Sequence, residues 1–329
     1  MALAGCGSDD APPKQAGGGS GGSSAGSSQG GAPVTGGVNA GGMTGGSTAT
    51  AGSGTGGSSL AGSGSCHGPY GQPLLVLAEE PDALINGISL TADERELYYS
   101  REKNAMQEVV RRTRASAGDM FGAVEPLPAL AGVCGDLPNV NPDISEDGLT
   151  LYVTCTAEMP PGMSEGVSPL RVARRADRSS DFTLEAEPIG NVFASAGISA
   201  DELTAYTDGE FFGTAPQMFT RATKAEAFSG PMEVPEIRNT GLRSLDISSD
   251  GLSLFGAVMI DEVTRIARAH RETEGAAFSE PVPLDLPLDL PMMPVALGVG
   301  APNVTAGCLL YMIVRLMDGQ YTVYRASPT

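Results

Sequence analysis

A short segment recurs along the second part of this chain, and it limits the possible folds more than any other feature. Residues 245–255 read Leu-Asp-Ile-Ser-Ser-Asp-Gly-Leu-Ser-Leu-Phe, and residues 143–152 read Asp-Ile-Ser-Glu-Asp-Gly-Leu-Thr-Leu-Tyr. Related copies lie at residues 87–99, 197–206 and 303–311; the first and third of these lack the Gly, and the last lacks the Asp. The copies succeed one another at intervals of roughly 50 residues, a period typical of propellers and other repeat architectures.

The residues between one copy and the next predict strands. An apolar residue, any residue and an arginine come first, and an aromatic residue then precedes a proline. The arginines are Arg111, Arg174, Arg221, Arg268 and Arg325. Short runs with period-two alternation, separated by Gly, Asp and Pro, indicate strands and turns. Each repeat therefore supplies four strands, which in the fourth repeat are expected at residues 244–248, 252–258, 264–269 and 281–284. We expect the repeated arginines to pair with acidic groups on adjacent strands.

The fifth copy ends at Thr329 without its aromatic-proline strand. The missing piece is found at the other end of the domain, where Tyr70-Gly71-Gln72-Pro73 matches Phe278-Ser279-Glu280-Pro281 in type and spacing. The sequence therefore predicts an all-β, five-bladed β-propeller over residues 66–329, closed by an N-terminal strand that completes the last blade. Ring closure leaves only short, protected strand edges.

The Ile-Ser-x-Asp-Gly-x-x-Leu-Tyr units of residues 70–329 resemble the WD-like β-propeller repeat of the TolB type. The second and fourth units are the most similar. This resemblance implies a propeller whose narrow end or channel binds proteins or small ligands. It does not imply one particular reaction.

Four cysteines of the expected propeller can form two disulfides. In the blade scheme Cys134 enters the first strand of blade two and Cys155 leaves its second strand. Cys308 begins the second strand of blade five, and Cys66 shortly precedes the strand that completes that blade. We therefore predict the pairs Cys134–Cys155 and Cys66–Cys308, the second of which would hold the ring closed. Four free thiols are the alternative.

The N-terminus has the features of an export signal and a tether. Leu3-Ala4-Gly5-Cys6 resembles the lipobox of bacterial lipoproteins, which implies lipidation of Cys6 and assigns residues 1–6 to the remnant of a signal peptide. Only five residues precede Cys6, so we expect the natural start to lie further upstream. Residues 7–65 are mostly Gly, Ser, Ala and Thr, a composition that predicts a disordered linker. The expected location is the outer membrane or periplasm, or the cell surface, with the lipid as the membrane contact.

The charge of the chain excludes some classes of partner. Acidic residues outnumber basic ones by 39 to 20, which gives a net charge of -19. A surface this negative repels phosphate backbones and anionic lipid, so we expect no nucleic-acid binding. The sequence contains no apolar run of about 18 residues, so no transmembrane helix is predicted. The domain is expected to be a monomer without a cofactor.

Few residues are suited to catalysis. The two histidines, His67 and His270, are expected to be exposed, at the domain edge and on an outer strand, so a Ser-His-Asp triad or a histidine-rich metal site is disfavoured. Polar residues are instead expected near the channel. They are Asn86, Asn141, Asp143, Asp246 and Asn303. Two of them, Asp143 and Asp246, could act as the acid and base of a glycosidase, because five-bladed propellers include glycosidases. The favoured alternative is that they satisfy backbone groups, as aspartates of repeat proteins commonly do, and binding of a cation or a polar ligand is a further alternative.

The sequence thus favours a binding or scaffolding module at a bacterial cell envelope, with a protein or glycan partner. The alternative from another class is a propeller glycosidase that uses the channel carboxylates. The first interpretation requires only a shaped face, whereas the second requires both carboxylates to line an open, substrate-sized cleft.

Overall fold

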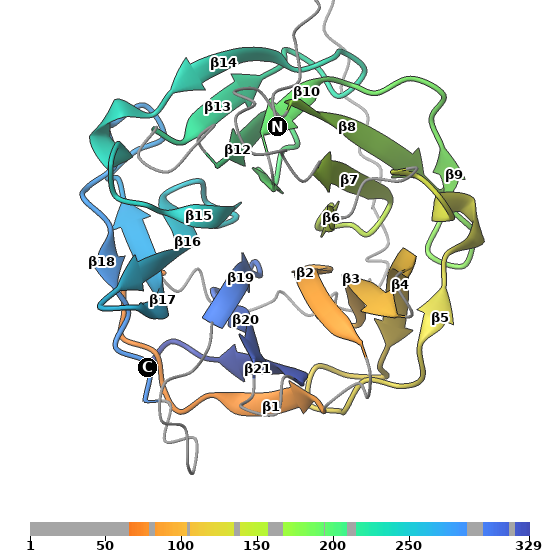
Figure 1. Cartoon of the computed structure of the whole chain (residues 1–329), viewed down its shortest axis with the longest axis horizontal. Helices are drawn as coiled ribbons and strands as arrows, with labels where there is room; N and C mark the ends of the chain where they lie inside the picture. Colours follow the sequence, from red (N-terminus) through yellow and green to blue (C-terminus); the bar gives the residue numbers. More distant parts are fainter. Residues whose placement is uncertain are drawn as a thin grey trace, which may run out of the picture. The chain divides into compact units, whose positions relative to one another are not determined.

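A computed structural model describes residues 66–78, 83–103, 106–134, 139–156, 167–193, 195–208, 215–287, 299–315 and 320–329. All of them belong to one unit that spans residues 57–329. Its strands form five antiparallel sheets around a central axis (Figure 1). The predicted five-bladed β-propeller is therefore confirmed. Cys6 and the expected linker at residues 7–65 lie outside the described residues.

The first three blades follow one another along the chain. Blade one consists of β2 (Leu84–Leu90), β3 (Glu96–Lys103), β4 (Met106–Thr113) and β5 (Glu125–Pro126). Blade two consists of β6 (Asn139–Ile144), β7 (Thr150–Thr156), β8 (Val167–Arg174), β9 (Thr183–Leu184) and β10 (Asn191–Phe193). Blade three consists of β11 (Ala196–Ile198), β12 (Thr204–Thr207), β13 (Gln217–Thr220) and β14 (Ser229–Glu233). Short 3-10 turns, η1 (Pro128–Leu130) and η2 (Pro235–Ile237), follow the outer strands of blades one and three.

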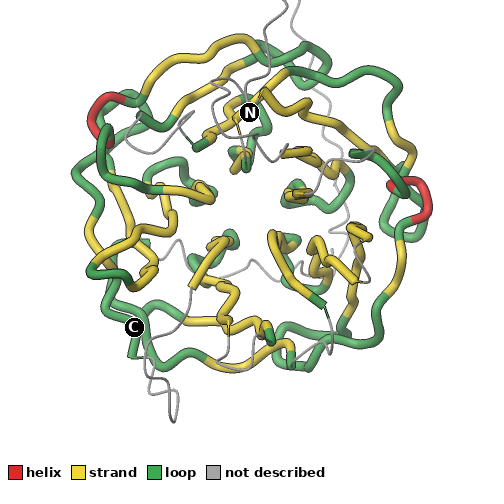
Figure 2. Tube along the Cα trace, viewed as in Figure 1, coloured by secondary structure: helices red, strands yellow, loops and turns green. Residues whose placement is uncertain are grey.

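The last two blades include the closure of the ring. Blade four consists of β15 (Arg243–Ile247), β16 (Ser253–Ile260), β17 (Val263–His270) and β18 (Val282–Pro283). Blade five consists of β19 (Val299–Val304), β20 (Leu310–Arg315), β21 (Tyr321–Ala326) and, from the N-terminal side, β1 (Leu74–Leu77). The four strands expected for the fourth repeat are found to within three residues. Figure 2 shows the strands of the five blades around the axis and the two 3-10 turns at the periphery of the ring.

The N-terminal strand closes the ring as predicted. Strand β1 pairs antiparallel with β21, and Leu74 lies opposite Arg325 (Figure 1). Both predicted disulfides are also confirmed. Cys66 is bonded to Cys308 and Cys134 to Cys155. Among the described residues no helix has the length and apolarity needed to cross a membrane.

The repeated Ser-x-Asp segment forms the turn between the first two strands of a blade. In blade two the Asp147 carboxylate accepts hydrogen bonds from the Ser145 hydroxyl (2.7 Å) and the Leu149 N–H (2.9 Å). The residue after the aspartate has positive φ, which glycine adopts without a Cβ clash, and Gly148 has φ 76°. The same bonds recur at Asp93, Asp201 and Asp250, so the aspartates of the turns serve the fold locally.

One arginine in each of blades one to four connects its blade to the preceding one. These arginines directly follow the third strand and are Arg114, Arg175, Arg221 and Arg271. The Nε of each donates to the carbonyl of the positive-φ turn residue of its own blade. The guanidinium lies over a buried phenylalanine, one of Phe121, Phe182, Phe228 and Phe278. A tyrosine from the second strand of the preceding blade completes the joint.

The joint between blades one and two shows these contacts in full. The Tyr98 hydroxyl donates to Glu96 at 2.7 Å, and Arg175 donates to the same carboxylate at 2.5 Å. Tyr98 also packs edge-on against Phe182, with ring centroids 6.0 Å apart. The arginine and glutamate side chains are 0% and 9% exposed. A buried charge pair is tolerable only when its polar atoms are hydrogen-bonded, and the joint meets that condition.

The joint that closes the ring, between blades four and five, is built differently. Phe255 stands in the position of the tyrosine, and Tyr70 packs edge-on against it. At the position of the positive-φ turn residue blade five has Cys308, with φ 59°, and this residue is covalently linked to Cys66. A disulfide therefore takes the place that the arginine has in the other joints.

Only Arg221 belongs both to these joint arginines and to the set that the repeat pattern singled out, and the hydrogen bonds of its guanidinium go to backbone carbonyls and the Tyr152 hydroxyl. Arg111, Arg268 and Arg325 share a position opposite the repeated aromatic residue, whereas Arg174 and Arg221 lie further along their repeats. Acidic partners are confirmed for Arg111 with Glu125, Arg174 with Glu185 and Arg325 with Glu94. Arg268 instead donates to the backbone carbonyls of residues 66–68.

We predict that Arg175→Met destabilises the protein by about 3–5 kcal/mol, because it leaves Glu96 buried without its cation. The adjacent substitution Arg174→Met is a matched control, since it breaks a pair with Glu185 whose side chains are 37% and 38% exposed. Such a pair contributes at most about 1 kcal/mol. Urea-induced unfolding of the two variants measures the difference, and equal losses would contradict a structural role for the joint.

Removal of the closing disulfide is predicted to cost more stability than removal of the other one. The bonds connect residues separated by 242 and 21 positions. The loop-entropy relation then gives roughly 5 kcal/mol for Cys66→Ser/Cys308→Ser and roughly 3 kcal/mol for Cys134→Ser/Cys155→Ser. Thermal unfolding of the two double variants under the same conditions tests the order. A larger loss from the Cys134–Cys155 pair would show that closure does not depend on the N-terminal link.

Candidate functional site

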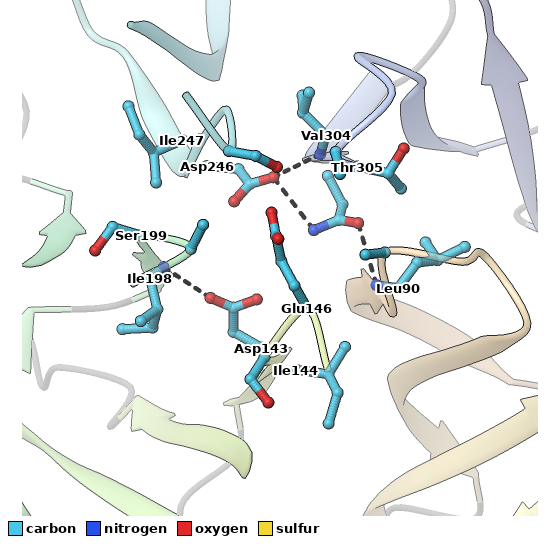
Figure 3. Close-up of a pocket in the computed structure, with 16 residues that line it drawn as sticks. Leu90, Asp143, Ile144, Glu146, Ile198, Ser199, Asp246, Ile247, Val304 and Thr305 are labelled. Carbon is cyan, nitrogen blue, oxygen red and sulfur yellow. Dashed lines mark hydrogen bonds between the residues drawn. The ribbon is translucent and has the colours of Figure 1, made fainter. Parts of the chain in front are cut away.

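The inner strands of the five blades place one equivalent residue each around the axis. This residue stands two positions before the serine or threonine of the turn. The five residues are Ser89, Asp143, Gly197, Asp246 and Asn303, and we call them the axial ring. Figure 3 shows the two aspartates from different blades, with Glu146 between them in this view.

Side chains of the axial ring bind the backbone of the next blade. The Asp143 carboxylate accepts the Ile198 N–H at 2.7 Å, and Asp246 accepts the Val304 N–H at 2.6 Å (Figure 3). The same relation links the other two polar members to their neighbours, through bonds from Leu90 N–H to Asn303 Oδ1 (3.1 Å) and from Ile144 N–H to Ser89 Oγ (3.0 Å). The ring thus acts as a set of clamps between adjacent blades.

The ring side chains also bind one another. The Ser89 hydroxyl donates to Asp143 at 2.8 Å, and the Asn303 amide donates to Asp246 at 3.2 Å. The series of clamps is interrupted at Gly197, which has no side chain. A Cβ at Gly197 would lie 2.5 Å from the Leu245 carbonyl oxygen, so the close approach of blades three and four requires glycine there.

Burial makes the ring carboxyls weak acids. It raises the pKa of Asp143 to about 6, even though this carboxylate accepts two hydrogen bonds. It also raises the pKa of Asp246 well above its usual value, and the charge of Asp143 adds to that rise. Desolvation and a neighbouring like charge both disfavour ionisation. A third buried acid, Asp208, directly follows β12, the second strand of blade three. Burial raises the pKa of Asp208 to about 7.

The open space along the axis is small. Two cavities, each of about 30 Å³, share Asp143, Asp246 and Asn303 in their linings. The first lies beside the turns, and Glu146 also lines it. A water molecule needs about 10–15 Å³ on this measure, so each cavity holds about two waters. Pockets for ligands are roughly ten times larger.

The structure brings together three of the five predicted channel residues, namely Asp143, Asp246 and Asn303. Asn141 lines only the second cavity, and Asn86 is a half-buried residue of β2 that lines neither. Ser89 was not among the predicted residues, because the repeat pattern aligns Ser89 itself with the turn serine of the other repeats. The turn position belongs to Thr91, whose hydroxyl donates to Asp93. Aligning the repeats on Asp93 instead would have placed Ser89 in the axial ring, two positions before Thr91.

The fold and its axial ring define this chain as a five-bladed β-propeller with a narrow, polar channel. A scan against known protein families finds no match, and a search of curated proteins finds none either. Similar solved structures exist. An α-L-arabinofuranosidase from Podospora anserina superposes with a TM-score of 0.50 at 10% identity, over 80% of this chain and 98% of the other.

Two further structures show how far the likeness extends. The catalytic domain of a GH62 α-L-arabinofuranosidase from Coprinopsis cinerea has a TM-score of 0.50 at 8% identity, over 80% of this chain and 98% of that one. TolB from Acinetobacter baumannii has a TM-score of 0.37 at 14% identity, over 74% of this chain and 54% of that one. At these identities the likeness to the two arabinofuranosidases shows the fold and nothing more.

We predict that Asp143→Asn stabilises the protein above about pH 6 and has little effect near pH 4. The folded-state pKa of about 6 exceeds the unfolded value of about 3.9, so the folded state binds more protons between these limits. Stability of the wild type therefore falls as pH rises through this window. An asparagine can still accept the Ile198 N–H and can donate to Ser89. The upper limit of the gain is about 3 kcal/mol, since one pKa unit corresponds to about 1.4 kcal/mol.

Thermal unfolding from pH 4 to pH 8 checks this expectation. The exposed turn residue Asp261 offers a matched control, as Asp261→Asn removes one carboxylate far from the axis. A variant Asp143→Asn that is less stable than the wild type at pH 8 would mean that the ionised carboxylate is required by the clamp.

Proposed function

We propose that this chain is an exported β-propeller that is anchored in a bacterial cell envelope through lipid on Cys6. In this proposal the propeller binds a protein or glycan partner and catalyses no reaction. One observation carries the proposal. The carboxylates best suited to catalysis each accept a backbone N–H of the neighbouring blade, beside cavities with room for about two waters each.

The disulfides support the expected compartment. Two disulfides are typical of a protein that folds in an oxidising environment outside the cytosol. A lipidated Cys6 followed by the Gly- and Ser-rich residues 7–65 would hold the propeller away from the membrane surface. A flexible chain of that length has a root-mean-square span of roughly 40 Å.

The surface around the first cavity is the candidate contact face for the partner. The turns of all five blades meet there, and the residues after the turn serine or threonine are small in four of them. These residues are Ala92, Ala200, Ser249 and Ala306. In blade two the corresponding residue is Glu146. Small side chains allow a partner to approach the backbone of the turns closely, and the aspartates beside them are already engaged within their own turns.

A propeller glycosidase is the second candidate function. It is favoured by two buried acids that both have raised pKa values, because glycosidases use a pair of carboxyl groups, one of which must be protonated to act as the general acid. The two arabinofuranosidases among the similar structures add to this possibility. Raised pKa values also arise in purely structural networks, and the ring clamps are such a network.

The test of the proposed anchor measures whether lipid is attached to Cys6. The full chain, preceded by a complete lipoprotein signal sequence, is expressed in a bacterial host with a clickable fatty-acid analogue, and Cys6→Ser is the matched variant. We expect label and membrane association for the parent only, with Cys6→Ser released in soluble form. Absence of label on the exported parent would refute the anchor.

Catalysis is tested on the same purified protein with aryl α-L-arabinofuranosides and arabinan. The proposal expects no hydrolysis above a buffer blank. Hydrolysis that disappears in both Asp143→Asn and Asp246→Asn would replace the binding function with the glycosidase.

A further inference from the structure

The interfaces between neighbouring blades are not equally strong, and the one between blades three and four has the fewest contacts of the kinds that connect the others. The two blades lie side by side in the ring (Figure 1). Blade three has short inner strands, since β11, β12 and β13 contain three, four and four residues. Its strands supply one fully buried residue, Tyr206, to the described apolar cluster at this interface. Blade two supplies Tyr152, Leu170 and Val172 to the corresponding cluster between blades two and three.

The axial ring forms no clamp between blades three and four. Gly197 is the ring member of blade three, and it has no side chain that could bind the next blade. In blades three and five the clamped groups are the N–H of Ile198 and of Val304 (Figure 3). The corresponding group of blade four is the N–H of Ile247, which interacts with the Asp246 carboxylate of its own blade. At the axis, blades three and four are therefore held by packing alone.

The arginine joint of this interface lacks a buried carboxylate. In the other three arginine joints, the hydroxyl of the joint tyrosine donates to a buried glutamate. These glutamates are Glu94, Glu96 and Glu202. At the interface between blades three and four, Tyr206 is bound by the half-buried Arg271, which forms no ion pair among the described residues. Gly251 stands where blades one and three have Glu94 and Glu202.

Asp208 supplies a hydrogen-bonded link across this interface. Its carboxylate accepts the N–H groups of Ser244 and Leu245, two successive residues of β15 in blade four. Ser244 has φ 51°, and an irregular backbone of this kind can aim successive N–H groups at one anion. The corresponding side chains of blades one and two, Ser100 and Thr154, instead bind the backbone of their own blades. Asp208 thus replaces the clamp that is missing at Gly197.

The second cavity borders the same interface. Residues 195–197 of blade three and residues 244–246 of blade four form part of its lining. A separation of these two blades would therefore widen the cavity on one side. Proteins open locally where few buried contacts oppose the opening, at a smaller free energy than global unfolding requires.

We propose that the ring opens between blades three and four under native conditions, and that Asp208 is the latch that holds this interface closed. The open ring would admit to the second cavity a ligand larger than the waters that fit the closed one. This inference does not depend on the proposed function.

The test measures how often an interface opens, by the labelling of a buried thiol. The full chain carries Cys6→Ser, so that an introduced cysteine is the free thiol beside the two disulfides. Leu245→Cys reports on the interface between blades three and four. Ala196→Cys is the matched control between blades two and three, because both residues are buried and directly precede an axial-ring residue. Each labelling rate is compared with the rate that the variant's own urea-measured stability sets for global unfolding. We expect Leu245→Cys to be labelled at least about tenfold faster than that limit and Ala196→Cys to be labelled at it.

Variants of the latch identify its role. Asp208→Ala should accelerate labelling about tenfold more at Leu245→Cys than at Ala196→Cys, because a charged hydrogen-bond acceptor is lost at one interface only. Asp208→Asn retains an acceptor oxygen and should have a much smaller effect. Gly251→Glu should slow labelling at Leu245→Cys alone. It adds the missing carboxylate at a position where Glu94 and Glu202 have φ 58° and 59°.

Two results would overturn the proposal. One is labelling of Leu245→Cys at the rate set by its global unfolding, and the other is acceleration by Asp208→Ala that is equal at both cysteines. If Asp208→Ala does not fold, the comparison of the two cysteines and the effect of Gly251→Glu decide.

Discussion

Each joint between the first four blades and their predecessors depends on one guanidinium, which is buried at Arg114, Arg175 and Arg221 and half-buried at Arg271. Such a group is stable only if its donors find acceptors and its faces find apolar or aromatic cover. Arg221, for example, donates to the Glu202 carbonyl and the Tyr152 hydroxyl and lies over Phe228. These partners come from the turn, the loop before the outer strand and the preceding blade. The arginine therefore fixes the position of one blade relative to the next.

The joint between blades four and five lacks this device. Blade five combines the last three strands of the chain with β1 from the N-terminal side of the domain. The residue just after β21 is Ser327, near the end of the chain, and offers no guanidinium. A joint that brings distant segments together must also overcome a larger loss of chain entropy. The Cys66–Cys308 bond lowers that loss by restricting the unfolded chain, and the Tyr70–Phe255 contact supplies apolar cover.

The repeat was sufficient to predict the five blades. The residues that occupy equivalent positions within the blades were harder to predict. The period and the match between Tyr70-Pro73 and Phe278-Pro281 were sufficient for the closure, and the strand order then determined both cysteine pairs. Three of the four joint arginines, Arg114, Arg175 and Arg271, were missed because they lie one residue beyond the strand, where the apolar alternation has ended. Ser89 was missed because the first repeat contains an extra Ile-Ser that imitates the turn signal.

The axial carboxylates show why a conspicuous pair of acids is not by itself an active site. Asp143 and Asp246 have raised pKa values because the ring encloses them, and the ring encloses them because each binds the backbone of the next blade. The raised pKa values of these two acids are therefore a consequence of their enclosure in the axial ring. Each aspartate therefore joins two blades, and its burial and its raised pKa both follow from that structural role.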